Sequence, residues 1–192
     1  MSLAHDLLPL AALLVLVAMA LWFSLAARTH FNEKSPRRPL MFALEAVSLA
    51  ICLGTIGAVV FGSPHSIVRS ALALAFGCGA GLLFSSALRA TRNRKFGVVF
   101  GGTVPDAIID HGPYHFIRHP LYTAYLLNWI GCFLVSGSIL IGLGSVAIAV
   151  LYLVAARGEE RDLLNSPQGW RYAEYRCSTG LFLPRLRKGT KP

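Results

Sequence analysis

Five long apolar segments dominate the sequence and limit the folds that it can adopt. They cover residues 7–27, 40–61, 67–88, 121–135 and 139–156. A helix needs about 20 apolar residues to cross the hydrocarbon core of a bilayer, where only helices and closed barrels satisfy their backbone hydrogen bonds. Charged residues make up only 14% of the chain, which excludes an ordinary soluble domain. We therefore predict an all-α polytopic membrane protein with five transmembrane helices in one domain, residues 1–192.

Short connections and small residues indicate how these helices pack. The fourth and fifth segments are separated only by Ser136, Gly137 and Ser138, which predicts a closing helical hairpin. The third segment contains Gly77, Gly79 and Gly81. Small residues allow helices to approach closely in a membrane, so we expect all three glycines at helix contacts.

The positive charges predict the orientation of the chain. Seventeen of its 18 Lys and Arg residues lie in residues 28–39, 89–120 and 157–192, which share one side of the membrane if there are five spans. Cytoplasmic loops collect Lys and Arg. We therefore expect an outside N-terminus and a cytoplasmic C-terminus in a multi-pass protein, and its small size suggests a prokaryotic plasma membrane. The net charge of +9 then requires no nucleic-acid partner.

The first apolar segment is expected to be a retained helix. The first six residues contain no Lys or Arg, and the positive cluster follows the apolar run. A cleaved signal peptide has the opposite arrangement. The second segment contains Glu45 about one turn from its start. A carboxylate at that depth either serves a function or reaches water or a loop arginine, and the sequence leaves both readings open.

Two predicted cytoplasmic regions hold the residues that can support chemistry: the loop 89–120 and a C-terminal cap, residues 157–192. A loop of this length is typical of a binding loop or lid. His111, His115 and His119 recur every four residues, as in some helical metal sites, but Gly112 and Pro113 interrupt that register. We predict no metal site.

Adjacent carboxylates open the predicted cap. Glu159 and Glu160 lie between Arg157 and Arg161, next to the membrane boundary. One reading is a solvated helix with local ion pairs. The other is that a carboxylate here faces a cofactor.

Two motifs resemble those of a known family. Gly112-Pro113-Tyr114 followed by Arg118-His119-Pro120-Leu121-Tyr122 resembles the signature of isoprenylcysteine carboxyl methyltransferases, a class related to phospholipid methyltransferases. The downstream series resembles the closing pattern of the same family: Glu159, Glu160, Gly169, Tyr172, Tyr175, Gly180 and Pro184. The five-span layout is also similar to that of small prokaryotic members.

The resemblance implies an S-adenosylmethionine site, with S-adenosylhomocysteine as product. It assigns Asp106, Ala107, Ile108 and Ile109 to the nucleoside, and Tyr114, His119, Pro120, Leu121 and Tyr122 to the rest of the pocket. It implies Glu160 as the cofactor-contacting carboxylate, or Glu159 if the register slips by one. The family's substrate arginine corresponds to Ala156 here, and Arg157 beside it is the candidate for positioning the substrate.

We therefore predict a membrane methyltransferase whose acceptor is a lipid or a lipidated molecule, most like a prenylcysteine carboxyl O-methyltransferase. A carboxylate acceptor needs no general base, whereas the amine of a phospholipid, the alternative acceptor, must first lose a proton. His115 and Glu160 are the candidate bases. Two further alternatives are an NADPH-dependent reductase that resembles sterol reductases, and a non-catalytic protein that binds metal or haem.

Overall fold

A computed structural model describes residues 3–30, 38–62, 66–91 and 108–185 of the chain. Asp106 and Ala107, two of the expected nucleoside-binding residues, lie outside this part. The helices in chain order are α1 (Leu3–His30), α2 (Arg38–Phe61), α3 (Ile67–Thr91), the 3-10 turn η1 (Gly112–His115), α4 (Pro120–Ser136), α5 (Ile139–Leu164) and α6 (Gly169–Ser178).

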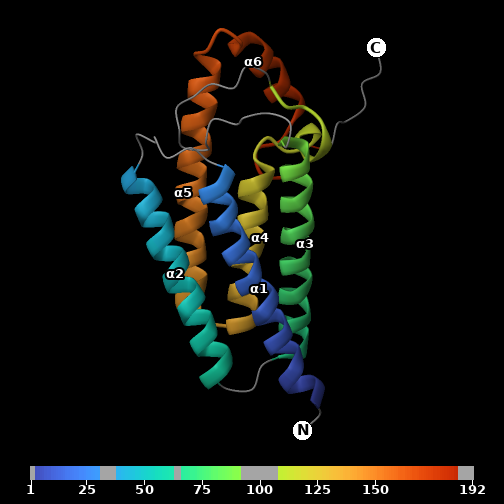
Figure 1. Cartoon of the computed structure of the whole chain (residues 1–192), viewed down its shortest axis with the longest axis vertical. Coiled ribbons are helices and arrows are strands. Elements are labelled where there is room, and N and C mark those ends of the chain that lie inside the picture. The colour runs from blue at the N-terminus through green and yellow to red at the C-terminus, as the bar shows by residue number, and fades with distance from the viewer. Residues whose placement is uncertain (1–2, 31–37, 63–65, 92–107, 186–192) are drawn as a thin grey trace.

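The long helices form one bundle, and α6 lies beyond one end of it (Figure 1). Four of them, α1, α2, α3 and α5, are long and apolar enough to cross a membrane, while α4 is a shorter apolar helix of 17 residues. The prediction of an all-α polytopic membrane protein is confirmed. Lipid-facing side chains such as Leu14, Leu53 and Leu143 are exposed along the bundle, as expected where lipid replaces water.

The short helix α4 is central to the bundle. It contacts α1, α2, α3 and α5, and its contact with α3 is the most extensive between any two elements. Its buried side chains follow several faces: Leu121, Tyr122, Ala124, Asn128, Trp129, Cys132 and Val135. A helix of this length is about 25 Å long. The helices around α4 cover most of its surface.

Close packing around α4 depends on small residues, although not on all those expected. A Cβ on Gly77 would lie 3.0 Å from Val15, and one on Gly81 would lie 2.9 Å from Met19 Sδ, so both face α1. A Cβ on Gly79 would meet nothing within 4 Å. The expectation for Gly79 was wrong, because it points to the opposite side of α3 from the other two glycines.

The predicted hairpin between α4 and α5 is present. Gly137 ends α4 in the left-handed conformation, with φ of 62°, and its N–H donates to Phe133 O over 2.9 Å. The Arg69 guanidinium packs where a Cβ on Gly137 would lie. Glycine is therefore required at this turn for both its conformation and its size.

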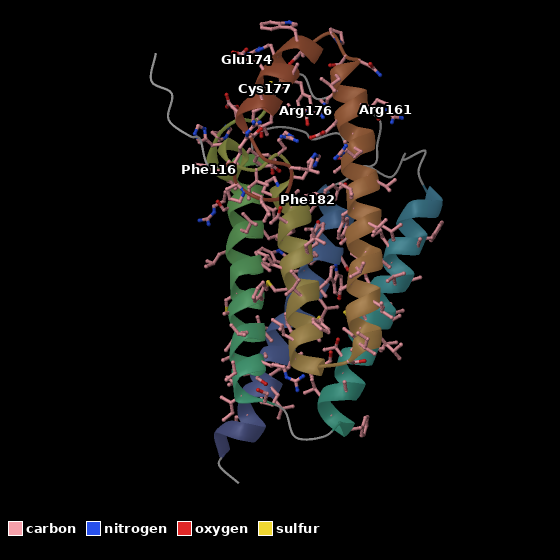
Figure 2. All side chains as sticks on the ribbon, turned by 180° about the vertical axis from the view of Figure 1, so that it is seen from behind. Phe116, Arg161, Glu174, Arg176, Cys177 and Phe182 are labelled. Atoms are coloured by element: carbon pink, nitrogen blue, oxygen red, sulfur yellow. The ribbon has the colours of Figure 1, made fainter. Side chains whose placement is uncertain are left out.

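The fifth helix continues past its expected end. The apolar segment ends at residue 156, but α5 runs to Leu164, eight residues further. Arg, Glu and Leu favour helices, so the change from apolar to charged residues marks a membrane boundary and not a helix end. The extension carries Arg161 beyond the ends of α3 and α4 and runs beside α6, which holds Glu174, Arg176 and Cys177 (Figure 2).

The carboxylate in the second apolar segment lies away from the bundle core. Glu45 is exposed on α2. Leu44, next to it, is buried in the main apolar cluster, which also contains Leu16, Ile148 and Tyr152. Helical neighbours point about 100° apart, so burial of Leu44 directs Glu45 outward.

Candidate functional site

The start of α4 positions the first group of polar side chains. Gly112, with φ of 60°, and Pro113 begin the short turn η1, and Pro120 occupies the first turn of α4. The two prolines separate the turn from the helix, so His111 and His115 do not share a helical face with His119. His111 and His115 are exposed, whereas the His119 side chain is only 9% exposed.

The chain after α6 returns to this loop and pairs with it. Gly180 N donates to Phe116 O over 3.1 Å, and Arg118 N donates to Gly180 O over 2.8 Å. His119 N donates to Leu181 O over 3.1 Å, and the Thr123 hydroxyl donates to Phe182 O over 2.9 Å. The loop before α4 and the segment after α6 therefore hold each other in place.

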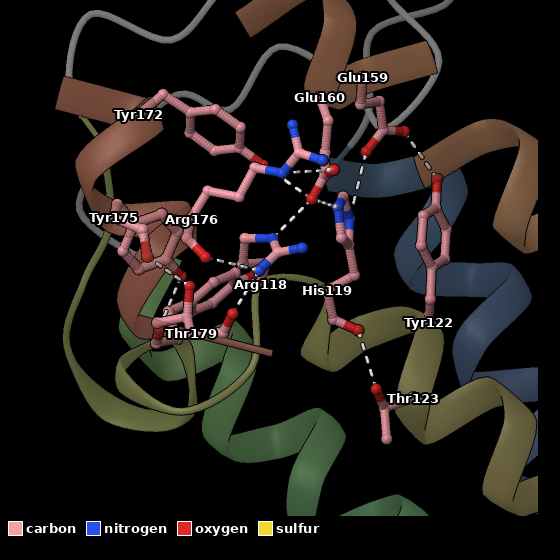
Figure 3. A network of polar contacts seen from close by, with 11 residues as sticks. Arg118, His119, Tyr122, Thr123, Glu159, Glu160, Tyr172, Tyr175, Arg176 and Thr179 are labelled. Carbon is pink, nitrogen blue, oxygen red and sulfur yellow. Dashed lines mark hydrogen bonds and ion pairs between the residues drawn. The ribbon is translucent and has the colours of Figure 1, made fainter. Parts of the chain in front are cut away.

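Glu160 is the centre of a buried polar network (Figure 3). Arg118 Nε donates to Glu160 Oε1 over 2.5 Å, and the Tyr172 hydroxyl donates to the same oxygen over 3.3 Å. Arg176 Nε lies 3.7 Å from Glu160 Oε2. The Arg118 guanidinium also donates to the carbonyls of Arg176 and Thr179 near the end of α6. One guanidinium thus joins α5 to α6.

Glu159 faces a different set of groups. The Tyr122 hydroxyl donates to Glu159 Oε1 over 2.7 Å, and His119 Nδ1 lies 3.6 Å from Glu159 Oε2. The His119 and Tyr122 rings stack, with centroids 5.5 Å apart and planes 13° apart. Tyr122 in turn stacks on Tyr152 of α5, with centroids 4.9 Å apart. The carboxylate therefore lies at the edge of an aromatic cluster.

His119 is the buried polar group between the two carboxylates. Its Nε2 is buried and makes no hydrogen bond, although it lies 3.8 Å from Glu160 Oε1. Burial lowers the pKa of His119 below its ordinary value and the Arg118 charge acts in the same direction, against the opposing effect of Glu160. The imidazole is therefore neutral at pH 7 and offers one nitrogen for a ligand.

This lowered pKa predicts a pH dependence of stability. The unfolded chain takes up a proton near the ordinary histidine pKa of about 6.5, while folded His119 resists it. The unfolded state then binds more protons than the folded state. The contribution of neutral His119 to stability is therefore complete above the ordinary histidine pKa and is lost as the pH falls below it. We expect the thermal midpoint in detergent to fall on acidification, and to fall less in His119→Gln. Equal pH slopes in the two proteins would contradict the assignment.

The structure brings together four of the residues that the resemblance implied: His119, Tyr122, Glu159 and Glu160. Others lie close by in the chain but are buried in packing: Ile109, Tyr114, Pro120 and Leu121. Tyr114 contributes its backbone carbonyl, which accepts from the Tyr175 hydroxyl over 2.6 Å. Ile108 is half-buried.

The candidate substrate residue lies elsewhere on its helix. Arg157 is exposed on α5, whereas Ala156 is fully buried in the same apolar cluster as Tyr122 and Tyr152. The two positions point in different directions, as neighbouring helical residues must. The side chain of Arg157 therefore does not take the place that an arginine at 156 would occupy.

Sequence reasoning missed the roles of Arg118, Tyr172, Arg176 and Thr179. Arg118 and Tyr172 belong to the two recognised motifs, and this membership was the signal that could have identified them as site residues. Their partners lie 42 and 12 residues away in the chain. Among the residues that the structure describes, no three His, Cys, Asp or Glu side chains are placed to hold a metal ion.

Comparison with known proteins identifies the family of this chain. A stretch of 87 residues is 33% identical to the cobalt-zinc-cadmium resistance protein CzcN of Cupriavidus metallidurans. This match covers 44% of the chain and 39% of that protein, so the chain spans about two fifths of the length of this relative. The model of the phospholipid methyltransferase family matches residues 67–166, just over half of the chain, from the start of α3 to the end of α5. The chain belongs to the phospholipid methyltransferase family.

Proposed function

We propose that this chain is a membrane methyltransferase that uses S-adenosylmethionine and acts on a lipidic or lipidated acceptor. The observation that carries the proposal is the convergence of His119, Tyr122 and Glu159 at one end of the bundle. These residues come from both motifs of the family resemblance, and both motifs lie within or next to the family match. The finer assignments below rest on this convergence.

The residues present fit the chemistry of the cofactor. S-adenosylmethionine supplies a methyl group on a positively charged sulfur, and also carries an ammonium and a carboxylate. Glu159 offers a carboxylate to a positive group, and the buried Nε2 of His119 offers a nitrogen without a hydrogen bond. The Tyr122 ring stacks on His119 and on Tyr152, so these three rings form an aromatic wall beside Glu159. The buried side chains around them exclude water, which strengthens these interactions.

The position of the site suits one soluble and one lipidic reactant. It lies where α4 begins and where α5 leaves the bundle, and most of the arginines that the structure describes lie at this end. We propose that this end is cytoplasmic. A soluble cofactor then arrives from the cytoplasm and the acceptor from the bilayer, so the protein mainly has to hold the two in line.

The acceptor is a prenylcysteine carboxylate or the amine of a phospholipid. A carboxylate acceptor is favoured by a nearby cation, but position 156 is a buried alanine and Arg157 is exposed. Arg118 already binds Glu160 and two carbonyls. The lack of an arginine at position 156 supports the phospholipid amine as the alternative acceptor. Of the two candidate bases, Glu160 is held by Arg118, and His115 is exposed on the turn η1.

The experiment is calorimetric titration of the protein in detergent with S-adenosylhomocysteine, with NADPH in parallel. We expect saturable binding of S-adenosylhomocysteine alone. His119→Ala should weaken it about tenfold or more, or about 1.4 kcal/mol, because it removes a buried ligand nitrogen. His111→Ala, which changes an exposed histidine outside the network, is the control.

A second assay then identifies the acceptor. Transfer of a labelled methyl group into a prenylcysteine carboxylate or into an aminophospholipid would distinguish the two acceptors. Binding of NADPH alone would replace the methyltransferase with a reductase. Equal affinity of wild type and His119→Ala for S-adenosylhomocysteine would remove His119 from the site.

A further inference from the structure

Two exposed arginines continue the lipid-facing surface of α5 past the apolar part of the helix. We propose that Arg157 and Arg161 bind the phosphate of an anionic phospholipid in the headgroup layer of the membrane. The site lies on the outer surface of the bundle and uses no residue of the polar network around Glu160. The inference therefore goes beyond the proposed function and does not depend on it.

The two arginines share one stripe of α5 with apolar side chains that face lipid. Successive residues of an α-helix are rotated by about 100°, and this rotation places six exposed positions within an arc of about 80°. The six are Leu143, Val146, Val150, Val154, Arg157 and Arg161. The four apolar members are each more than half exposed. The surface that α5 presents to lipid therefore ends in two guanidinium groups.

Helix geometry places these groups at the depth of lipid headgroups. Each residue rises by about 1.5 Å, so Arg157 and Arg161 lie about 4.5 Å and 10.5 Å beyond Val154 along the helix axis. The headgroup layer on each side of the hydrocarbon core is roughly 5–8 Å thick. Arginine keeps its apolar stem against lipid and extends its charged end toward the polar layer. Both guanidiniums can therefore reach a phosphate in this layer, one from each side of it.

The charges of the two arginines are not neutralised within the part of the chain that the structure describes. Neither side chain takes part in a hydrogen bond or an ion pair there. The adjacent Glu160 is buried against Arg118, and Figure 2 shows Arg161 on the other side of α5 from Arg176. Like charges four residues apart on a helix repel each other. An anion bound between Arg157 and Arg161 would remove this repulsion.

A phospholipid satisfies both parts of this surface. Guanidinium groups match the oxygens of a phosphate with paired hydrogen bonds. The acyl chains of the same lipid can pack on Val150 and Val154, which lie directly below the arginines on the stripe. A soluble phosphate would contact the arginines alone and would leave the apolar side chains unused. The continuity of charged and apolar surface therefore favours a lipid as the source of the phosphate.

The test is native mass spectrometry of the protein in detergent, titrated with phosphatidylglycerol, phosphatidylcholine of the same acyl chains, or glycerol phosphate. We expect the wild type to bind phosphatidylglycerol more tightly than either of the others. In the double variant Arg157→Gln/Arg161→Gln, its affinity should fall about 30-fold, or about 2 kcal/mol, since each basic residue beside an anionic headgroup contributes about 1 kcal/mol. The affinity for phosphatidylcholine should change little.

The matched control is the double variant Arg89→Gln/Arg171→Gln. Arg89 and Arg171 are exposed on α3 and α6, so the control removes the same charge from two separated places and should bind phosphatidylglycerol as the wild type does. All four positions are exposed, so the thermal midpoints without lipid should change little and will show that both variants fold.

Three outcomes would overturn the proposal. Equal affinity of the wild type and Arg157→Gln/Arg161→Gln for phosphatidylglycerol would exclude the site. An equal loss in the control would reduce the effect to net charge. Binding of glycerol phosphate as tight as that of phosphatidylglycerol would assign the two arginines to a soluble anion.

Discussion

Arg118→Gln is expected to lower the free energy of unfolding by about 3–5 kcal/mol, the range for breaking one side of a buried ion pair. Arg118 is the closest cation to Glu160, at 2.5 Å, and the two side chains are only 9% and 4% exposed. Glutamine leaves the Glu160 carboxylate buried beside a neutral group. The change also removes the donor to the carbonyls of Arg176 and Thr179, so the end of α6 loses two of its contacts.

The matched control is Arg176→Gln. Arg176 also faces Glu160, but at 3.7 Å and with a side chain that is 44% exposed. Exposed ion pairs contribute about 0–1 kcal/mol, so the thermal midpoint should change little. Arg118→Lys keeps the charge but loses the planar guanidinium that reaches Glu160 and both carbonyls, and should fall between the two. Equal midpoints for Arg118→Gln and Arg176→Gln in detergent would show that Glu160 does not depend on Arg118.

The membrane helices were predictable because hydropathy is a local property. Each apolar segment became a helix, and the limits of α4, Pro120–Ser136, differ from the expected 121–135 by one residue at each end. Pro120 and the Gly137 turn mark these ends chemically. The central position of α4 was not predictable, since an apolar segment looks the same whether its neighbours are lipid chains or other helices.

The end of α5 shows a limit of the same reasoning. Hydropathy falls after Ala156, and this fall was read as the start of a separate cap. Helix formation depends on backbone hydrogen bonds and side-chain propensity, and neither changes at that point. The helix continues until the Ser166–Pro167 turn, so the two glutamates are held rigidly at its end.

The site was predictable as a set of residues and not as a set of contacts. His119, Tyr122, Glu159 and Glu160 were all named from the two motifs, and they meet. Which glutamate binds which partner depends on the rotation of α5 against the loop and on the return of the chain after α6. These are long-range features of packing, which the local sequence around residues 159 and 160 does not encode.

Gly131→Val is expected to destabilise the bundle by about 1–3 kcal/mol, the usual cost of adding atoms to a packed interior. A Cβ on Gly131 would lie 2.6 Å from Leu16 Cδ2 of α1 and 3.3 Å from the Ala73 carbonyl oxygen of α3. Leu16 and Ala73 are themselves buried, so neither can move aside freely. Gly131 therefore sets the approach of α4 to two of its neighbours.

The comparison that isolates packing is Gly79→Val on α3, where a Cβ would meet nothing within 4 Å. Both substitutions replace a helical glycine with the same residue, so backbone entropy and helix propensity change alike. Only the space around the new side chain differs. We expect a lower thermal midpoint in detergent for Gly131→Val and an unchanged or higher one for Gly79→Val. Similar shifts in the two variants would mean that α4 does not pack against α1 and α3 in this way. The start of α4, with His119 and Tyr122, would then lack the packing on which the geometry of the site depends.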